Sequence, residues 1–516
     1  MKTKYIIPVL YVFAFFVQSC NTFLDEDPKS YIAETNFYKN NDNAIGAINA
    51  AYGAMRQEVV NLDFMWMNEL TTDDVTYTGT TVGERIEMDL LVYNSKHNFL
   101  KNQWFYCYNC INRANVVLDY VNEGVTDSLK YRIYGEARFL RAFQYFRLVR
   151  WFGGVPLKIK ATNGDPASLY QPRATVQQVY DQIIEDLKYA EQNLDDKYSY
   201  TDPLNGGRAT AGAAKALLGK VYLTMAGYPL QQTDKWQLAA DKLNEVIVNK
   251  AKYGYDLMPN LADIFDVEKK AANTEAIWYT SGTNGLTQTG WYFTRMYSWS
   301  GNLIPTKEMW KTSTKVFTSG STTNIDYNKY DSTGLYEITD LRRKAFIKRR
   351  SGTNHTDIDT GTGTPVYAKY IDIAKGSTDS RNDYPHIRYT EVVLMAAEAL
   401  AEVGGQAKMD SALMYINLLR GRAGVGSLTY TDQNILRDII HKERRRELCY
   451  EGHRWCDLVR WNIFPETIKN HLVHQNYPTY TLDNLNYIGN NQNLFPIPAA
   501  EIINNPNFGG QNPGYE

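Results

Sequence analysis

Residues 439–461 read Ile439-Ile-His-Lys-Glu-Arg-Arg-Arg-Glu-Leu-Cys-Tyr-Glu-Gly-His-Arg-Trp-Cys-Asp-Leu-Val-Arg-Trp461, with apolar side chains at helical spacing between charged ones. We expect Glu443, Arg446 and Glu447 to form ion pairs with a structural role. If the helix continues, Cys449 and Cys456 share one face with the histidine between them. Structural zinc sites use four ligands, so buried thiols are favoured over a metal site here, and a disulfide stays open.

Outward from this segment, helical periodicity recurs through most of the chain. The predicted helices cover residues 44–60, 104–121, 131–152, 176–193, 211–226, 236–249, 389–403 and 409–423. Gly153-Gly154 and Pro156 end the third of these helices. Residues 214–247 have about the length of one tetratricopeptide unit, near 34 residues, and residues 389–423 form a similar pair. The sequence therefore predicts a mainly α-helical fold of tetratricopeptide-like helix pairs.

Two regions interrupt the helical pattern, at residues 66–101 and 252–383. The second is rich in Gly, Thr, Ser, Asn and Tyr. Long irregular insertions on a rigid scaffold commonly carry binding sites. Within the second insertion, the basic run at residues 341–350 is interpreted as a solvated face or a strand.

The N-terminus predicts export. Lys2 and Lys4 precede an almost wholly apolar run at residues 5–17, which is too short for a membrane span and typical of a secretory signal. Cys20 closes the run and predicts cleavage after residue 19 with acylation of the cysteine. Several acyl chains anchor stably, because each buried methylene contributes about 0.8 kcal/mol. An ordinary signal peptide with a chance cysteine is the alternative.

Composition and motifs narrow the function. A net charge of −2 gives no reason to expect nucleic acid. The sequence has no Gly-x-Ser-x-Gly elbow and no His-Glu-x-x-His, and Ala213 stands where a phosphate loop needs lysine. His471 and His474 are interpreted as surface residues. A pair of glycosidase carboxylates is defined by a distance in space, so the sequence leaves it open.

Several segments together resemble one known family. They are residues 439–461, the tail Asn493-Leu-Phe-Pro-Ile-Pro498 with the residues that follow, Glu136-Ala-Arg-Phe-Leu-Arg-Ala-Phe-Gln-Tyr-Phe146, Phe152-Gly-Gly-Val-Pro156, the helix at 208–222 and the helix at 388–398. In this order they resemble the SusD/RagB family of outer-membrane nutrient-binding lipoproteins of Bacteroidetes. The resemblance implies a SusD-like α-helical fold with long loop insertions. It divides the chain into a signal peptide at 1–19 and regions at 20–250 and 251–516, which together form one compact unit.

The resemblance also implies a location, a partner and a ligand site. The protein would be lipid-anchored at the surface of the outer membrane, with a SusC-like TonB-dependent transporter as its partner. The site would use aromatic and polar residues on the irregular loops, because aromatic planes stack on sugar rings while carboxylates and Arg pair with hydroxyls. The candidates are Asp73, Asp74, Tyr77, Arg85, Trp291, Tyr292, Tyr297 and Trp299. Trp66 and Trp104, on predicted helices, are expected in the core.

The sequence thus predicts a non-catalytic receptor that captures an oligosaccharide or polysaccharide and delivers it to the transporter. No cofactor is expected, and a structural calcium ion stays open. A peptide-binding receptor like RagB is the first alternative. A glycoside hydrolase and a scaffold that binds only proteins are the others.

Overall fold

The computed structural model describes residues 37–60, 63–78, 83–202, 205–282, 303–306, 309, 335–337, 339–351, 354–356, 363–372, 381–474 and 493–515. The predicted signal segment with Cys20 lies outside the described residues, as do the predicted site residues Trp291, Tyr292, Tyr297 and Trp299. None of the helices that are described is long and apolar enough to cross a bilayer.

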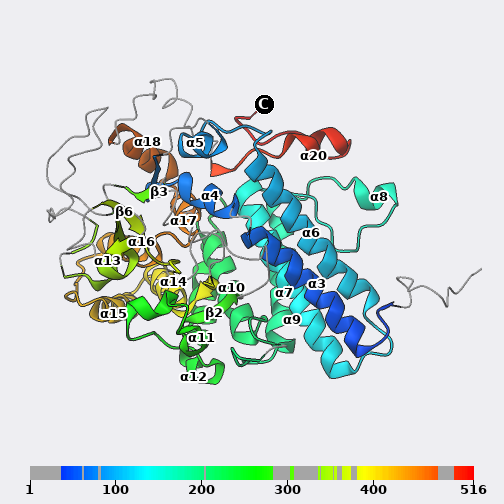
Figure 1. The fold of residues 1–516 in the computed structure, drawn as a ribbon, viewed down its shortest axis with the longest axis horizontal. Coiled ribbons are helices and arrows are strands. Elements are labelled where there is room, and N and C mark those ends of the chain that lie inside the picture. Colours follow the sequence, from blue (N-terminus) through cyan, green and yellow to red (C-terminus); the bar gives the residue numbers. More distant parts are fainter. Residues whose placement is uncertain are drawn as a thin grey trace, which may run out of the picture.

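The first half of the chain forms a layer of long helices, seen on the right of Figure 1. Its helices are α3 (Asn41–Val60), α4 (Asp63–Leu70), α5 (Glu84–Asp89), α6 (Asn98–Tyr120), α7 (Asp127–Phe152), α8 (Pro166–Leu169) and α9 (Val176–Asn193). Helix α7 packs against α3, α6 and α9 and is buried along most of its length. Phe139 and Phe143 of α7 meet the Trp278 ring edge-on, at centroid distances of 4.7 and 4.6 Å. This helix is the centre of the core.

Most of the helices that follow α9 lie beside this first layer (Figure 1). The described helices after α9 are α10 (Ala211–Ala226), α11 (Lys235–Val248), α12 (Lys250–Tyr253), α13 (Leu341–Phe346), α14 (Tyr389–Val403), α15 (Gln406–Arg422), α16 (Gln433–Leu448), α17 (Arg454–Arg460), α18 (Phe464–His474) and α20 (Ala499–Asn504). Two short 3-10 helices, η2 (Leu261–Phe265) and η3 (Lys270–Ala272), follow α12. The mainly α-helical prediction is confirmed, and the tetratricopeptide-like assignment of the pairs α10–α11 and α14–α15 stays a prediction.

Helix boundaries follow local capping. Thr175 begins α9 with a capping box to Gln178, and the Thr210 side chain accepts from Ala213 N at the start of α10. Gly153 ends α7 in the left-handed region, at φ 72°. The predicted bounds 176–193, 211–226 and 389–403 are those observed.

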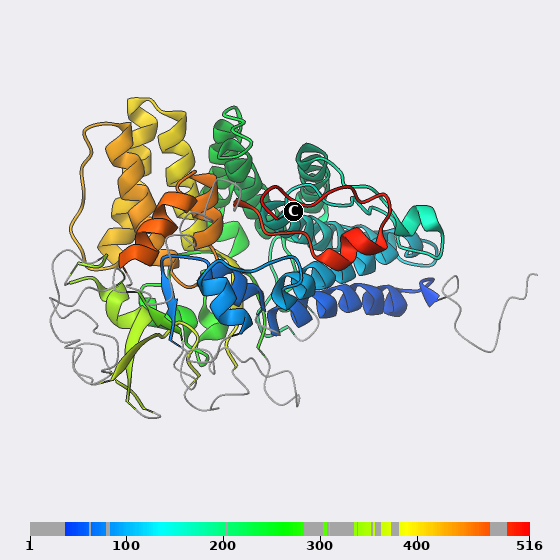
Figure 2. The same ribbon diagram turned by 90° about the horizontal axis from the view of Figure 1, so that it is seen from above.

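Short strands gather on one side of the molecule. β2 (Ala276–Thr280) pairs antiparallel with β7 (Tyr384–Arg388), and β4 (Ile347–Ser351) lies between β5 (Asn354–Thr356) and β6 (Thr364–Tyr367). β1 (Val75–Tyr77) pairs antiparallel with β3 (Leu303–Pro305). Figure 2 shows yellow-green strands along the lower edge, opposite the tall helices of the second half. The irregular insertions therefore emerge on one side of a helical scaffold.

The C-terminal tail crosses back to the first half. Phe495 N donates to Trp151 O at 2.7 Å, and Asn512 Nδ2 donates to Phe152 O at 3.1 Å and to Phe495 O at 2.8 Å. Arg173 Nη2 donates to Asn512 Oδ1 at 2.7 Å. The tail thus closes the end of α7, although the division of the chain at residue 250 stays a prediction.

The predicted continuous helix at 439–461 is wrong. The chain leaves α16 at Cys449 and re-enters a helix at Arg454, and Tyr450 and Gly452 adopt positive φ values of 63° and 75°. Cys449 and Cys456 therefore do not share a helix face with His453. Cys107, Cys110 and Cys449 are free and buried, as predicted, and Cys456 is free and half-buried.

Two further surface predictions are wrong. The basic run contains a strand, as predicted, but Arg342, Arg343 and Arg349 are buried, because their guanidinium groups enter the interior rather than solvent. His471 is also buried, on α18. Trp66 and Trp104 lie in the core as predicted.

Candidate ligand-binding face

The pairing of β1 with β3 joins the two irregular insertions. Val75 lies opposite Pro305, and Tyr77 lies opposite Leu303. β1 follows α4 in the first insertion, and β3 follows residues 283–302 of the second. The structure therefore brings the predicted residue Tyr77 next to the point where the chain returns from the segment that contains Trp299.

Asp73 and Asp74 immediately precede β1 and hold it in place through buried ion pairs. Arg454 Nε and Nη2 donate to the two oxygens of Asp73 at 2.7 and 2.8 Å, and Arg445 Nε donates to Asp74 Oδ1 at 2.6 Å. Both carboxylates are buried. Burial by itself would raise the pKa of Asp73, but the charges of Arg445 and Arg454 outweigh it and hold this pKa well below its usual range.

The contacts of these two aspartates are thus internal, and they position the strand. Thr306 also contacts the backbone of these two aspartates. Its hydroxyl donates to Asp73 O at 2.8 Å, and its amide donates to Asp74 O at 3.0 Å. Direct contact of Asp73 or Asp74 with a ligand stays a prediction.

Arg85 on α5 and Tyr77 on β1 lie at the edge of the candidate ligand-binding face, which these two elements form. Arg85 is exposed and places its guanidinium carbon 4.3 Å from the centroid of the buried Trp66 ring. Tyr77 is half-buried, and its amide donates to Asp89 Oδ1 at 3.3 Å. Nearby, burial raises the pKa of Asp63 to about 6, against the hydrogen bond from Asn102. The face offers a stacked cation and a tyrosine to a ligand with hydroxyl groups.

The structure also contains a cleft near the end of β2 that the sequence did not predict. Its volume is about 330 Å³, and it lies between α3 and the end of β2, lined by Tyr52, Arg56 and Tyr279 among others. Tyr200 stacks on Tyr279 at a centroid distance of 5.5 Å, and its hydroxyl donates to Asp383 Oδ2 at 2.8 Å. Successive side chains of a strand point to opposite faces of the sheet. This alternation along β2 was the only sequence signal that Tyr279 could lie at the surface.

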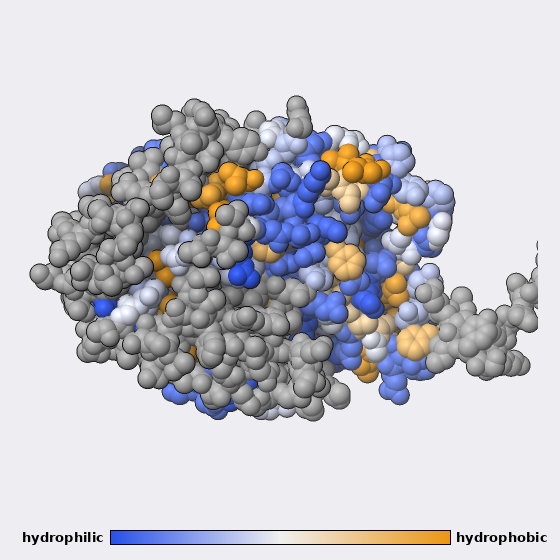
Figure 3. Space-filling view, turned by 45° about the horizontal axis from the view of Figure 1, so that its top comes forward, coloured by the Kyte–Doolittle hydropathy of each residue, from blue (hydrophilic) through white to orange (hydrophobic). Residues whose placement is uncertain are grey.

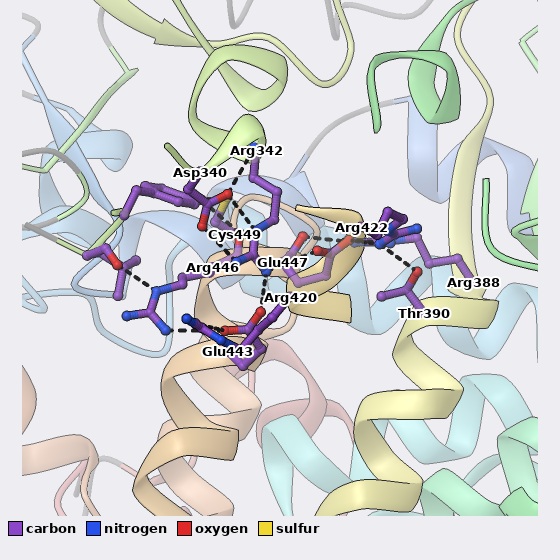
Figure 4. Close-up of polar contacts among 12 residues, drawn as sticks. Asp340, Arg342, Arg388, Thr390, Arg420, Arg422, Glu443, Arg446, Glu447 and Cys449 are labelled. Carbon is purple, nitrogen blue, oxygen red and sulfur yellow. Dashed lines mark hydrogen bonds and ion pairs between the residues drawn. The ribbon is translucent and has the colours of Figure 1, made fainter. Parts of the chain in front are cut away.

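A buried network of arginines and carboxylates holds the scaffold behind the face (Figure 4). Arg342 Nη1 donates to Glu443 Oε1 at 2.6 Å, and Arg422 Nη2 donates to Glu447 Oε1 at 2.7 Å. Arg388 Nη1 lies 3.1 Å from the same Glu447 oxygen. The predicted ion pairs of Glu443, Arg446 and Glu447 are confirmed, since Arg446 Nη1 donates to Glu443 Oε2 at 3.2 Å.

This network joins elements far apart in sequence, because its arginines come from α13, β7 and α15 and its glutamates from α16. Burial alone would raise the pKa of Glu447, but Arg422, Arg388 and Arg342 hold it well below its usual range. The carboxylates of Glu443 and Glu447 are paired with arginines of the protein, which is consistent with a structural role for the network.

The turn between α16 and α17 connects the network to the face. Gly452 N donates to Glu69 Oε1 at 2.6 Å, and Tyr450 stacks on Tyr367 at a centroid distance of 4.4 Å. Tyr367 in turn donates its hydroxyl to Asp74 O at 2.9 Å.

No group of three or more His, Cys, Asp or Glu side chains is placed to hold a metal ion within the part of the chain that the structure describes.

The fold is a mainly helical scaffold with irregular insertions, and comparison with known proteins gives its family. The SusD family model matches residues 244–515, and the model described as starch-binding associating with outer membrane matches residues 22–223. The chain belongs to the SusD family, which confirms the resemblance.

Relatives match over nearly the whole chain. SusD-like protein P2 of Formosa agariphila is 28% identical, covering 95% of this chain and 96% of its own. The starch-binding protein SusD of Bacteroides thetaiotaomicron is 25% identical, with coverages of 87% and 84%. Among solved structures, a laminarin-binding SusD-like protein aligns with TM-score 0.68 and 26% identity, covering 93% of this chain and 100% of its own. A SusD superfamily protein of Parabacteroides distasonis aligns with TM-score 0.70 and 25% identity, with coverages of 92% and 99%.

Proposed function

We propose that this protein binds an oligosaccharide or polysaccharide at the face formed by β1, α5 and the two insertions, and delivers it without chemistry to a SusC-like TonB-dependent transporter. The observation that carries the proposal is the pairing of Tyr77 with Leu303, which joins both insertions at one place. Arg85 and Tyr77 supply a planar cation and an aromatic ring there, which suit hydroxyl groups and sugar faces.

The second insertion can supply further aromatic rings to this face. Trp299 precedes Leu303 by four residues, so covalent geometry limits the distance between their Cα atoms to about 14 Å. Trp291, Tyr292 and Tyr297 lie earlier in the same segment. We propose that some of these rings stack on the glycan beside Tyr77 and Arg85.

Relatives support a glycan as ligand. One relative is named for starch binding and another for laminarin binding. Both align with this chain over more than four fifths of its length. Oligosaccharides derived from starch and laminarin are therefore the first probes.

Calorimetry with the mature chain from Asn21 onward tests the proposal against a panel of oligosaccharides, polysaccharides and peptides. We expect saturable heat with one glycan class and a clear loss of affinity in Trp299→Ala and Arg85→Ala. Tyr131→Ala is the matched control, because Tyr131 is 50% exposed on α7, away from this face. Binding of peptides and of no glycan would favour the RagB-like alternative, and release of shortened sugars would favour a hydrolase.

We further propose that acylated Cys20 anchors the protein at the outer membrane beside its transporter. Cys20→Ala should move the protein from the membrane fraction to the soluble fraction of fractionated cells. Co-purification of the wild-type protein with a TonB-dependent transporter from detergent-solubilised membranes tests the partner. Purification of the receptor alone under mild detergent would count against it.

A further inference from the structure

A second groove lies between α6, α20 and residues 156–170, all of them described. Its volume is about 410 Å³, within the range of about 300–1,000 Å³ typical of small-molecule sites. Trp104, Tyr108 and Asn115 of α6 form its floor, while Tyr170 and Glu501 lie on its walls. Figure 3 shows apolar patches among polar side chains on this part of the surface, to the right of the grey residues.

Aromatic rings at the groove are exposed to solvent. Phe105 is 61% exposed, and Tyr170 is 37% exposed. Tyr108 packs on Trp104 at a centroid distance of 5.1 Å, and its hydroxyl donates to Pro156 O at 2.7 Å, so its ring is held in place. Exposed aromatic rings that gather at one groove commonly mark a binding surface.

The polar lining consists largely of carboxamides. Asn115 is fully used, since its Nδ2 donates to Lys158 O and Lys160 O at 2.9 Å and its Oδ1 accepts from Arg141. By contrast, the Asn109 and Asn504 side chains make no hydrogen bond to any described residue. An amide offers donors and an acceptor together, which matches a hydroxyl group that does both.

Two charged groups line the groove, each with one hydrogen-bond partner from the protein. Lys158 Nζ donates to Leu169 O at 3.3 Å, and the Glu501 carboxylate accepts a hydrogen bond from the Trp104 side chain. Burial lowers the pKa of Lys158 and raises that of Glu501. A wholly apolar partner would bury these charges further and leave the Asn109 amide without a partner, which is costly, whereas hydroxyl groups can hydrogen-bond to all three.

One side of α6 runs from the groove toward the candidate face. Asn98, Asn102, Phe105, Asn109 and Asn112 are spaced at three and four residues, so they share that side. Asn102 Nδ2 donates to Asp63 Oδ2 at 2.8 Å, near Arg85. From Asn102 to Asn112 the helix rises about 15 Å, which is the length of several sugar units rather than one.

We propose that this groove is a second oligosaccharide-binding subsite, which extends the candidate face along α6 so that the protein selects long glycan chains over short ones. The proposal rests on the proposed function for the class of ligand. A chain that reaches both places gains affinity through effective concentration, without any change at either place.

The test is the dependence of affinity on chain length in the mature protein. Calorimetry would compare dimers, tetramers and octamers derived from starch and from laminarin. The double variant Phe105→Ala/Tyr170→Ala should weaken octamer binding about tenfold and leave shorter oligosaccharides unchanged. Tyr131→Ala is the control, and urea unfolding checks that all variants fold, as expected for exposed side chains.

The outcomes separate this subsite from the candidate face. Octamer affinity unchanged in the double variant, while Arg85→Ala weakens every length, would overturn the subsite alone. Weakening of every length in the double variant, with no effect of Arg85→Ala or Trp299→Ala, would keep the groove as a site and overturn the proposed face. No binding by any of these oligosaccharides would overturn both.

Discussion

The charged residues around α16 and those near β1 differ in their environment. Around α16 they pair with one another inside the scaffold, whereas near β1 Arg85 lies at the surface. Glu447 is fully buried and meets three arginines, whereas Arg85 is exposed and lies over the face of Trp66. The interior pairs fix the relative positions of α13, β7, α15 and α16. The segments that reveal the family are therefore those that build the scaffold. In the proposed function, the choice of ligand would depend on exposed residues outside this network.

Breaking the interior should have the largest effect. Glu447→Ala removes one of the carboxylates that pair with the buried Arg388 and Arg422, although Glu275 still pairs with both. Breaking this buried pairing should lower the free energy of unfolding by about 3–5 kcal/mol. Asp438→Ala removes an exposed pair with Lys442 on the same helix and should cost less than about 0.5 kcal/mol. Urea unfolding of both variants measures the difference. Equal losses would contradict the contrast between buried and exposed pairs.

The turn after α16 should rank next. Gly452 has φ +75°, and an added Cβ would lie 3.0 Å from the Tyr384 hydroxyl, so Gly452→Ala should cost about 1–3 kcal/mol. Gly405→Ala is the control, because Gly405 has φ +84° with no atom within 4 Å of an added Cβ. Its loss should be nearer 1 kcal/mol, from backbone strain alone. A larger loss in Gly405→Ala would rule out crowding by Tyr384.

Glu69 should make stability depend on pH. Burial, with a further contribution from the charge of Asp74, raises its pKa from 4.5 to about 8. Between these values the folded state binds more protons than the unfolded state, so the contribution of Glu69 to stability falls as pH rises from 4.5 to 8. Glu69→Gln, which resembles the protonated form, should remove this decline. Unfolding free energies measured across pH 5–8 test it, and parallel curves for the two proteins would refute it.

The rim should matter least to stability. Arg85→Ala should change the free energy of unfolding by less than about 1 kcal/mol, because its cation–π contact is at the surface. Its effect should appear instead in glycan affinity, measured by calorimetry. Arg85→Lys keeps the charge but not the planar fork, and so separates charge from geometry. A stability loss comparable to that of Glu447→Ala would show that Arg85 belongs to the scaffold.

Local signals account for what the sequence predicted well. The bounds of α9 and α10 follow from Thr175 and Thr210, whose caps are made within three residues. The end of α16 could not be predicted in this way. Tyr450 takes a left-handed conformation, which a tyrosine rarely adopts, against a ring supplied by Tyr367 from a distant strand.

The sequence predicted that the two irregular insertions carry the candidate face. The structure places Tyr77 and Arg85 in the first of them, and their role in binding stays a prediction. The partners of Asp73 could not be foreseen, because Arg454 lies 381 residues further along the chain. The sequence did not reveal the groove beside α6, because Phe105 and Asn109 have the same spacing as residues on any exposed face of a helix.

The C-terminal tail also sets a condition on how the molecule is made. Asn512 and Phe495 complete the hydrogen bonds at the end of α7, the central helix of the first half. These carbonyl groups at the end of α7 gain their partners only when the last residues of the chain are present. If the predicted signal segment exports the chain from its N-terminus, the end of α7 is therefore completed last.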